Sequence, residues 1–402
     1  MHRLSIHCLL YSVVAFSLCN SAYADIAPPR TLEELKAETQ ARADRNAYPL
    51  TGLRPDEVRE ALAAIKSPDR DAWAAAWSAI GDRYLAQARA QEKTAPAAAR
   101  ENYLQAWRYY SFARWPVPNS PGKQKAYRRA LDAFQNYTRF LDPPLEVVRI
   151  PFEKSEIIGY LRLPAGVRPA PLVLMISALD SRKEDLVERG TAFLAQGIGV
   201  FALDMPGTGQ APINIDVGAE RMYSRALDYL VKRNEIDPNR IIVYGGSWGG
   251  HWSARLAFIE RARLKGAVAQ GAPVHDYFQP EWQRKALGTR EYLFDLFAAR
   301  ASVYGVQTLE EFLTYGPRMS LKDTGIISQP SVPMLLINGE RDTQVPIADL
   351  DLLLHNGSPK EAWVNPQGGH MGRSAEWPDA AIFNRVVVPW VVHTLEVTPG
   401  KH

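Results

Sequence analysis

The chain has 402 residues, of which 46% are hydrophobic and 23% charged, with 27 Gly and 29 Pro. This is ordinary globular composition, and it excludes collagen-like, coiled-coil and largely disordered proteins. The 47 basic and 44 acidic residues leave a formal net charge of only +3. Because no block of basic residues occurs, nucleic acid is not an expected partner.

Residues 1–24 have the features of a secretory signal peptide. Arg3 supplies the positive start, an apolar stretch follows at Leu9–Leu18, and Ala22-Tyr23-Ala24 offers small residues for cleavage before Asp25. The apolar stretch is far shorter than the ~20 residues that a membrane span needs. We therefore expect a secreted or periplasmic protein without stable membrane insertion.

Both cysteines, Cys8 and Cys19, lie inside this segment. A lipoprotein attached through Cys19 is disfavoured, because Leu18 stands where a small residue is expected. The processed chain would have no thiol, so neither a disulfide, a cysteine–metal site nor a cysteine nucleophile is expected.

Residues 25–144 are expected to form a helical cap domain. From Thr31 to Leu141 the chain is rich in Ala, Arg, Glu and aromatic residues. Apolar residues recur there at helical spacing, in three groups: Trp73, Trp77, Ile80 and Tyr84; Tyr103, Trp107 and Tyr110; Tyr127, Leu131, Phe134 and Tyr137. Prolines at Ser67-Pro68, Ala95-Pro96 and Trp115-Pro116-Val117-Pro118 are expected to separate the helices. Most of these aromatic side chains are expected to pack between helices rather than to contact a ligand.

Residues 145–402 are expected to form an α/β catalytic domain. The expected strands are Val147–Pro151, Ile157–Leu163, Leu172–Ser177, Val200–Asp204, Arg240–Gly245, Gly266–Gln270, Pro333–Asn338 and Ala362–Asn365. The expected helices are Glu184–Gln196, Val217–Arg233, Trp248–Ile259, Ile347–His355 and Asp379–Leu395. A hairpin followed by alternating strands and helices indicates a mostly parallel sheet covered on both faces. Residues 271–330 form an insertion with helical content and no convincing strand, which we expect to contribute to the cap.

One pentapeptide carries a specific chemical signal. Gly245-Gly246-Ser247-Trp248-Gly249 has the pattern G-x-S-x-G. An apolar strand, Arg240–Tyr244, precedes it, and a helix-forming stretch follows. A strand, sharp turn and helix with this pattern are typical of the nucleophile elbow of α/β-hydrolases, which exposes the serine hydroxyl.

A serine nucleophile needs a base and an acid that orients the base, and in α/β-hydrolases these follow in the order Ser, acid, His. Asp342 lies in the loop after an expected strand, with Glu340 as the competing acid. His370 lies on a Gly-flanked loop after the next strand. The remaining histidines of the processed chain, which fit this place less well, are His251, His275, His355, His393 and His402. We therefore predict the triad Ser247, Asp342 and His370.

An oxyanion hole requires two preorganised backbone N–H donors. Trp248, directly after the nucleophile, should give one of them. The other should come from the loop after the strand Leu172–Ser177, hence from Ala178 or Leu179. The Gly-containing turn Asp204–Gly209 lacks the lysine of a phosphate-binding loop, and we interpret it as a turn that shapes the site.

Several of these segments resemble the FrsA-like α/β-hydrolase family, the group that includes 2,6-dihydroxypseudooxynicotine hydrolase and related esterases. Ser177–Glu184 resembles the family pattern G-G-L-[DE]-S-x-K-E, and Asp204–Gly209 resembles D-G-P-G-x-G. Ala106–Ala113 and Tyr127–Val148 resemble its helical cap and the join to the core. The likeness extends from about Trp73 to Val392. It implies the triad named above and an active site between a helical cap and the sheet.

The sequence departs from the family patterns at two places. Ser177-Ala178 replaces Gly-Gly, and Met205 replaces a glycine; both should narrow or reshape the pocket. Some members of the family cleave carbon–carbon bonds beside a ketone, and others cleave esters. Carbon–carbon cleavage needs an acid to protonate the leaving carbon. His275, Asp276 and Glu281 are the candidate substrate contacts or acids.

Together these observations predict an exported serine hydrolase, carboxylesterase-like, that cleaves an ester or related acyl bond of a small hydrophobic or aromatic molecule. The alternative is a carbon–carbon hydrolase that uses the same triad beside a ketone. A non-catalytic binding protein would be expected to have a damaged triad, and this triad is complete. No cofactor or metal is expected, the only expected partner is the small-molecule substrate, and the oligomeric state is open, a homodimer included.

Overall fold

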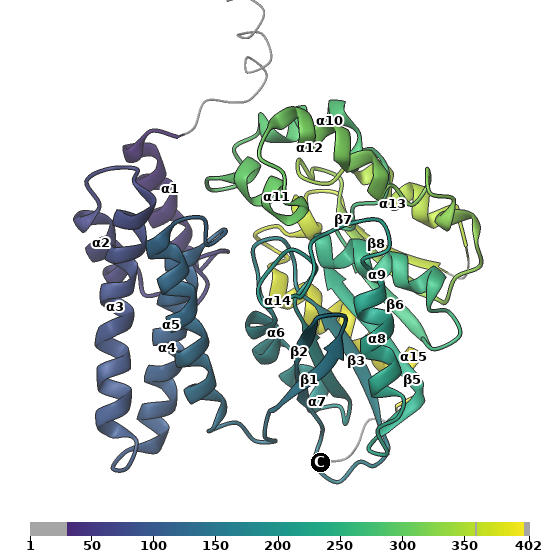
Figure 1. Cartoon of the computed structure of the whole chain (residues 1–402), viewed down its shortest axis with the longest axis horizontal. Coiled ribbons are helices and arrows are strands. Elements are labelled where there is room, and N and C mark those ends of the chain that lie inside the picture. Colours follow the sequence, from purple (N-terminus) through teal and green to yellow (C-terminus); the bar gives the residue numbers. More distant parts are fainter. Residues whose placement is uncertain (1–29, 358–359, 398–402) are drawn as a thin grey trace, which may run out of the picture.

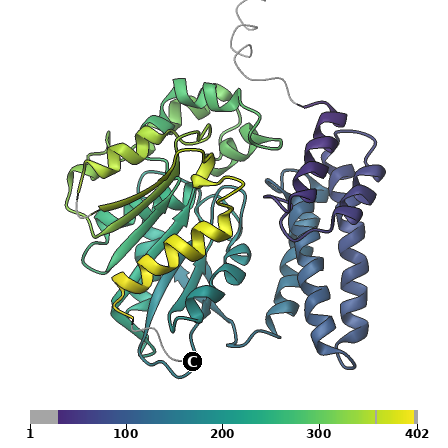
Figure 2. The same ribbon diagram turned by 180° about the vertical axis from the view of Figure 1, so that it is seen from behind.

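The computed structural model describes residues 30–357 and 360–397. The proposed signal peptide, residues 1–24, lies outside this range. Five helices come first: α1 (Leu32–Asp44), α2 (Pro55–Ala64), α3 (Arg70–Gln91), α4 (Pro96–Arg114) and α5 (Pro121–Thr138). They form a bundle that stands beside the sheet of the catalytic region (Figures 1 and 2). No helix in the described ranges is long and apolar enough to cross a membrane.

Proline and capping residues separate these helices as the sequence predicts. The three expected breaks fall between α2 and α3, between α3 and α4, and between α4 and α5. Proline begins α2, α4 and α5, where a missing N–H costs nothing. Asp69 accepts a hydrogen bond from Ala72 N at the start of α3. The aromatic residues pack inward: Trp77, Tyr103 and Tyr110 are at most 1% exposed, so they stabilise the bundle rather than face a ligand.

A sheet of eight strands follows, in the order β1-β2-β4-β3-β5-β6-β7-β8. The strands are β1 (Glu146–Phe152), β2 (Ser155–Arg162), β3 (Ala170–Ile176), β4 (Gly199–Leu203), β5 (Ile236–Gly246), β6 (Gly266–Gln270), β7 (Met334–Gly339) and β8 (Lys360–Asn365). β1 and β2 form a hairpin, and β2 also pairs antiparallel with β4. The other pairs are parallel. This is the mostly parallel sheet that the sequence predicts, and each expected strand is present.

Helices cover both faces of the sheet. Successive residues of a strand point to opposite faces, and here both faces carry apolar side chains that the helices bury. Leu172, Leu174 and Ile176 pack with α8 (Arg221–Leu230) and α9 (Trp248–Ile259). Val173 and Met175 pack with α6 (Lys183–Arg189), α7 (Thr191–Leu194) and α15 (Val388–Thr394). Figure 2 shows α15 crossing that second face. The same cluster includes Trp107 of α4 and Phe134 of α5, which joins the bundle to the catalytic region.

The segment 271–330 is helical and contains no strand. It carries α10 (Pro280–Leu287), α11 (Leu296–Tyr304), α12 (Leu309–Tyr315) and the short 3₁₀ turns Asp276–Phe278, Gly316–Met319 and Ile326–Ser328. These helices lie over one end of the sheet (Figure 1). The helix α13 (Ile347–Leu354) follows β7.

Three expected helices differ from the structure. The helix expected at Glu184–Gln196 divides into α6 and α7 at Gly190, which packs closely against Val200 of β4. The helix expected from Val217 begins only at Arg221, because Gly218 has a φ of +97°, which a right-handed helix excludes. The last helix divides into α14 (Asp379–Ile382), a π turn at Phe383–Val387 and α15. Pro389 follows that turn, and a proline cannot donate the usual helical hydrogen bond.

Candidate active site

Ser247 occupies a strained turn between β5 and α9. Its φ and ψ are 53° and −122°, unusual for a residue with a side chain. The neighbouring glycines make the turn sterically feasible: a Cβ on Gly245 would lie 2.0 Å from Gly249 O, and one on Gly249 would lie 2.5 Å from Ile176 O. Ser247 N donates to Gln270 O at 2.7 Å, which ties the turn to β6. This geometry is that of a nucleophile elbow.

The structure brings the three predicted triad residues together. His370 Nε2 lies 2.8 Å from Ser247 Oγ, and His370 Nδ1 lies 2.8 Å from Asp342 Oδ2. Asp342 follows β7 and His370 follows β8. All three side chains therefore come from the carboxyl ends of parallel strands. The competing acid Glu340 is exposed, and the hydrogen bond from His370 goes to Asp342.

The surroundings of Asp342 favour its charged form. Its Oδ1 accepts hydrogen bonds from Gln344 N at 2.7 Å and Val345 N at 2.9 Å. Burial would by itself raise the pKa of Asp342, but His370 and these two amides outweigh burial and hold the pKa below its ordinary value. An ionised Asp342 orients His370 with Nδ1 as donor, which leaves Nε2 free to accept the serine proton.

In the loop after β3, the amides of the two candidate second oxyanion donors differ in their hydrogen bonds. Ala178 N donates to Ser181 Oγ at 2.9 Å, so it is already engaged. Leu179 N makes no hydrogen bond with any residue that the structure describes. Trp248 is the first residue of α9, and its amide has no intrahelical acceptor. Trp248 and Leu179 thus offer the pair of free amides, and Ala178 does not.

The two segments that resemble family motifs are bound to each other. Lys183 Nζ lies 2.9 Å from Asp204 Oδ2, and Lys183 N donates to Asp204 Oδ1 at 2.9 Å. Met205 N donates to Ser177 Oγ at 3.1 Å. A Cβ on Gly209 would lie 2.3 Å from the Asp204 carboxylate. The turn at residues 204–209 therefore supports the loop that carries Leu179.

Three aromatic side chains lie near this loop. Tyr292 stacks on Trp115, with ring centroids 5.0 Å apart, and its hydroxyl donates to Asp180 Oδ2 at 2.8 Å. Trp115 Nε1 in turn donates to the hydroxyl of Tyr48 at 3.4 Å. These residues come from the bundle side and from the segment 271–330, and through Tyr292 they are joined to the residue after Leu179.

The candidate substrate contacts or acids His275, Asp276 and Glu281 lie in the segment after β6. His275 Nδ1 lies 2.8 Å from Ser320 Oγ, and the amides of His275 and Asp276 donate to Asp349. Glu281 is exposed on the first turn of α10. None of the three has a hydrogen bond or ion pair with the triad among the described contacts, and their role toward a substrate stays a prediction.

Glu291, which the sequence reading did not single out, touches the triad loops instead. Its Oε1 accepts from His370 N at 3.2 Å, and its Oε2 accepts from Thr343 Oγ1, next to Asp342. Its own carbonyl oxygen accepts from Arg42 of α1 at 2.7 Å. Glu291 and His370 are 79 positions apart, and no local pattern in the sequence marks such a contact. Among the described residues, no three His, Cys, Asp or Glu side chains gather as a metal-binding group.

Fold and site together define an α/β-hydrolase. A family model described as "Esterase FrsA-like" matches residues 57–362. The chain belongs to this FrsA-like family. Membership in the family indicates that the chain is an esterase or a related hydrolase.

Two relatives illustrate the range of the family. The chain is similar to Esterase FrsA of Vibrio cholerae serotype O1, with 30% identity over 290 residues that cover 70% of this chain and 68% of that protein. It is also similar to the 20-hydroxy-prefusarin hydrolase FUS2 of Gibberella moniliformis, with 26% identity covering 87% of this chain and 94% of that protein.

Solved structures agree on the fold. The crystal structure of 2,6-dihydroxy-pseudo-oxynicotine hydrolase has a TM-score of 0.73 at 22% identity and covers 89% of this chain and 97% of its own. Wild-type AbyA5 has a TM-score of 0.71 at 22% identity, with coverages of 92% and 96%. Both likenesses include the helical bundle as well as the sheet, since they extend over most of this chain.

Proposed function

We propose that this chain is an exported serine hydrolase that cleaves an ester or related acyl bond of a small hydrophobic or aromatic molecule. The main support for the proposal is the pair of hydrogen bonds that link Ser247 to His370 and His370 to Asp342, both at 2.8 Å. The similarity to a curated 20-hydroxy-prefusarin hydrolase supports the choice of a small organic substrate.

The geometry accommodates a two-step acyl transfer. His370 Nε2 accepts the proton of Ser247 as its oxygen attacks the acyl carbon. The amides of Trp248 and Leu179 donate to the resulting oxyanion, which is the state that such donors stabilise most. His370 then gives the proton to the leaving oxygen, and an acyl-enzyme remains on Ser247. A water molecule, deprotonated by His370, releases the acid product and restores Ser247.

A panel of p-nitrophenyl esters, aryl esters, carbamates and β-diketones tests this proposal on the wild type and on Ser247→Ala. Ser302→Ala is a suitable control, because the Ser302 hydroxyl only donates to Ala299 O within α11. We expect ester hydrolysis that S247A loses and S302A keeps, together with a fluorophosphonate adduct on Ser247. A folded wild type that remains unlabelled and inactive would refute it, and activity on β-diketones alone would favour the carbon–carbon hydrolase.

Export is tested separately. The features of residues 1–24 support cleavage after Ala24, and the exported product should begin at Asp25 when its N-terminus is sequenced. A product that stays in the cytoplasm with Met1 intact would overturn this part of the proposal.

A further inference from the structure

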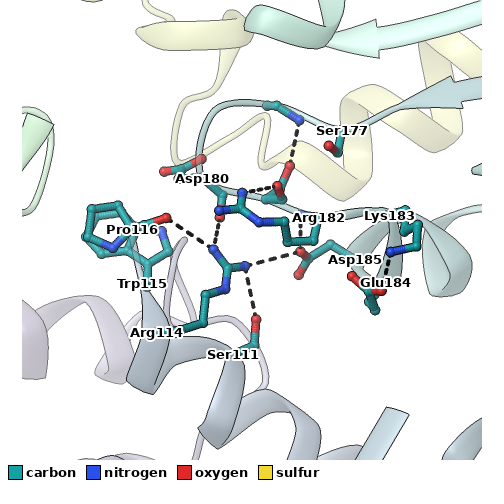
Figure 3. A network of polar contacts seen from close by, with 12 residues as sticks. Ser111, Arg114, Trp115, Pro116, Ser177, Asp180, Arg182, Lys183, Glu184 and Asp185 are labelled. Carbon is teal, nitrogen blue, oxygen red and sulfur yellow. Dashed lines mark hydrogen bonds and ion pairs between the residues drawn. The ribbon is translucent and has the colours of Figure 1, made fainter. Parts of the chain in front are cut away.

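Arg114 is a buried cation that reaches from the helical bundle into the catalytic region. It is the last residue of α4 and is only 2% exposed. Its Nη1 donates to Asp180 O at 2.6 Å and to Pro116 O at 3.2 Å. Its Nη2 donates to Ser111 Oγ at 3.3 Å. A side chain of the bundle thus binds the main chain of the loop that carries Leu179 (Figure 3).

A second guanidinium completes this arrangement. Arg182 Nη1 donates to Leu179 O at 3.3 Å and to Ser181 O at 2.6 Å. The carbonyls of three consecutive residues, 179 to 181, therefore each accept a hydrogen bond from a buried arginine. Since Ala178 N is bound to Ser181 Oγ, the loop is held on both sides of the free amide of Leu179.

Carboxylates pair with two of the three buried cations in this network, Arg114 and Lys183. Asp185 Oδ2 lies 3.9 Å from Arg114 Nη2 and accepts from Arg182 N at 2.7 Å (Figure 3). Lys183 is paired with Glu184 and Asp204, both at 2.9 Å. Moving the loop away would leave the buried Arg114 without its acceptors, which is strongly unfavourable for a charge. The loop is therefore held more firmly than a connection between a strand and a helix ordinarily is.

We propose that Arg114 is a positioning residue for the oxyanion hole, through which the packing of the helical bundle sets the orientation of the Leu179 amide. This inference rests on the proposed function. An oxyanion donor stabilises the transition state only if it is already aimed at the developing charge before reaction. Arg114 does not touch the reacting atoms. Its effect should consequently appear in the chemical step and in the binding of tetrahedral mimics, while substrate affinity stays the same.

The test uses Arg114→Met, which keeps the length of the side chain and removes its donors, and Arg114→Lys, which keeps the charge without the planar fork. Arg162→Met is the matched control. Arg162 is also 2% exposed and donates to two main-chain oxygens, Pro143 O at 3.1 Å and Asp142 O at 3.2 Å, but these belong to the join between bundle and sheet. For each variant, kcat, KM, the melting temperature and the affinity for a boronic acid that forms a tetrahedral adduct on Ser247 are measured.

We expect Arg114→Met to lower kcat by about 10- to 100-fold and to weaken binding of the boronic acid by a comparable factor. Its KM should stay within about 2-fold of the wild-type value. Arg114→Lys should lie between this variant and the wild type. Arg162→Met should lower the melting temperature yet keep kcat within about 2-fold when assayed well below it. If Arg114→Met does not fold, the same four measurements on Arg114→Lys test the inference.

Two results would overturn the inference: an unchanged kcat in a folded Arg114 variant, or a lower kcat with an unchanged affinity for the boronic acid. If the wild type is active on esters and labelled at Ser247, the proposed function stands even when one of these two results is found. A wild type that is inactive and unlabelled would instead remove the proposed function itself, so the two failures are distinguishable.

Discussion

Glu291 joins the two loops that carry Asp342 and His370, and replacing it should slow catalysis without removing the triad. One carboxylate accepts from His370 N on one loop and from Thr343 Oγ1 on the other. Each hydrogen bond to a charged group contributes about 1.5–3 kcal/mol when buried, and about 1 kcal/mol is reasonable for a half-exposed side chain. Glu291→Ala therefore forfeits roughly 2 kcal/mol of interactions that hold the loops together.

If about half of this loss raises the energy of the transition state, kcat drops roughly 5-fold, because about 1.4 kcal/mol corresponds to a factor of ten. Glu291→Gln keeps an acceptor for His370 N and should stay within about 3-fold of the wild type. Glu310→Gln is the matched control: Glu310 is an exposed glutamate of the same segment, on the first turn of α12, without a described contact to the triad, and the rate of this variant should not change.

Steady-state hydrolysis of a p-nitrophenyl ester, with a melting curve for each variant, measures these effects. The expected order of kcat is wild type and Glu310→Gln first, then Glu291→Gln, then Glu291→Ala. A Glu291→Ala variant with the kcat of the wild type would refute the reasoning. Equal losses in Glu310→Gln and Glu291→Gln would refute it as well, since they would trace the effect to charge in general.

Three further predictions follow from the site. Asp342→Asn should lower kcat by about 10³- to 10⁴-fold because the amide no longer fixes the tautomer of His370; a loss below tenfold in the same ester assay would contradict this role. Because folding lowers the pKa of Asp342 from its ordinary 3.8, its contribution to stability is present above that value and is lost as the pH falls through the lower folded value. The difference in melting temperature between wild type and Asp342→Asn should accordingly be largest near neutral pH and shrink below about pH 4, and a difference that is the same at pH 3 and pH 7 would count against it. Gly245→Ala should cost more than about 3 kcal/mol or prevent folding, because its Cβ would lie 2.0 Å from Gly249 O. Gly325→Ala, at a φ of +71° with open space around it, should cost only about 1 kcal/mol in a urea titration; similar losses for the two glycines would show that the clash is relieved.

The local signals in the sequence were sufficient for the strands, for most helices and for the nucleophile turn. The G-x-S-x-G pattern predicts the turn at Ser247 because the steric need for glycine involves residues within a few positions of one another. The placement of Asp342 and His370 follows from chain order, since both come directly after strands of one parallel sheet. The late start of α8 depends on the backbone conformation of a single residue, Gly218, which hydrophobic periodicity does not report.

Only the tertiary structure decided which groups surround the triad. The sequence left Ala178 and Leu179 as equal candidates, and the hydrogen bond from Ala178 N to Ser181 Oγ distinguishes them. It gave no sign of Glu291, which tertiary packing brings to His370 N. The reason is physical. A turn or a strand is encoded by neighbours along the chain, but a contact such as Arg114 with Asp180, which spans 66 positions, exists only once the bundle has packed on the sheet.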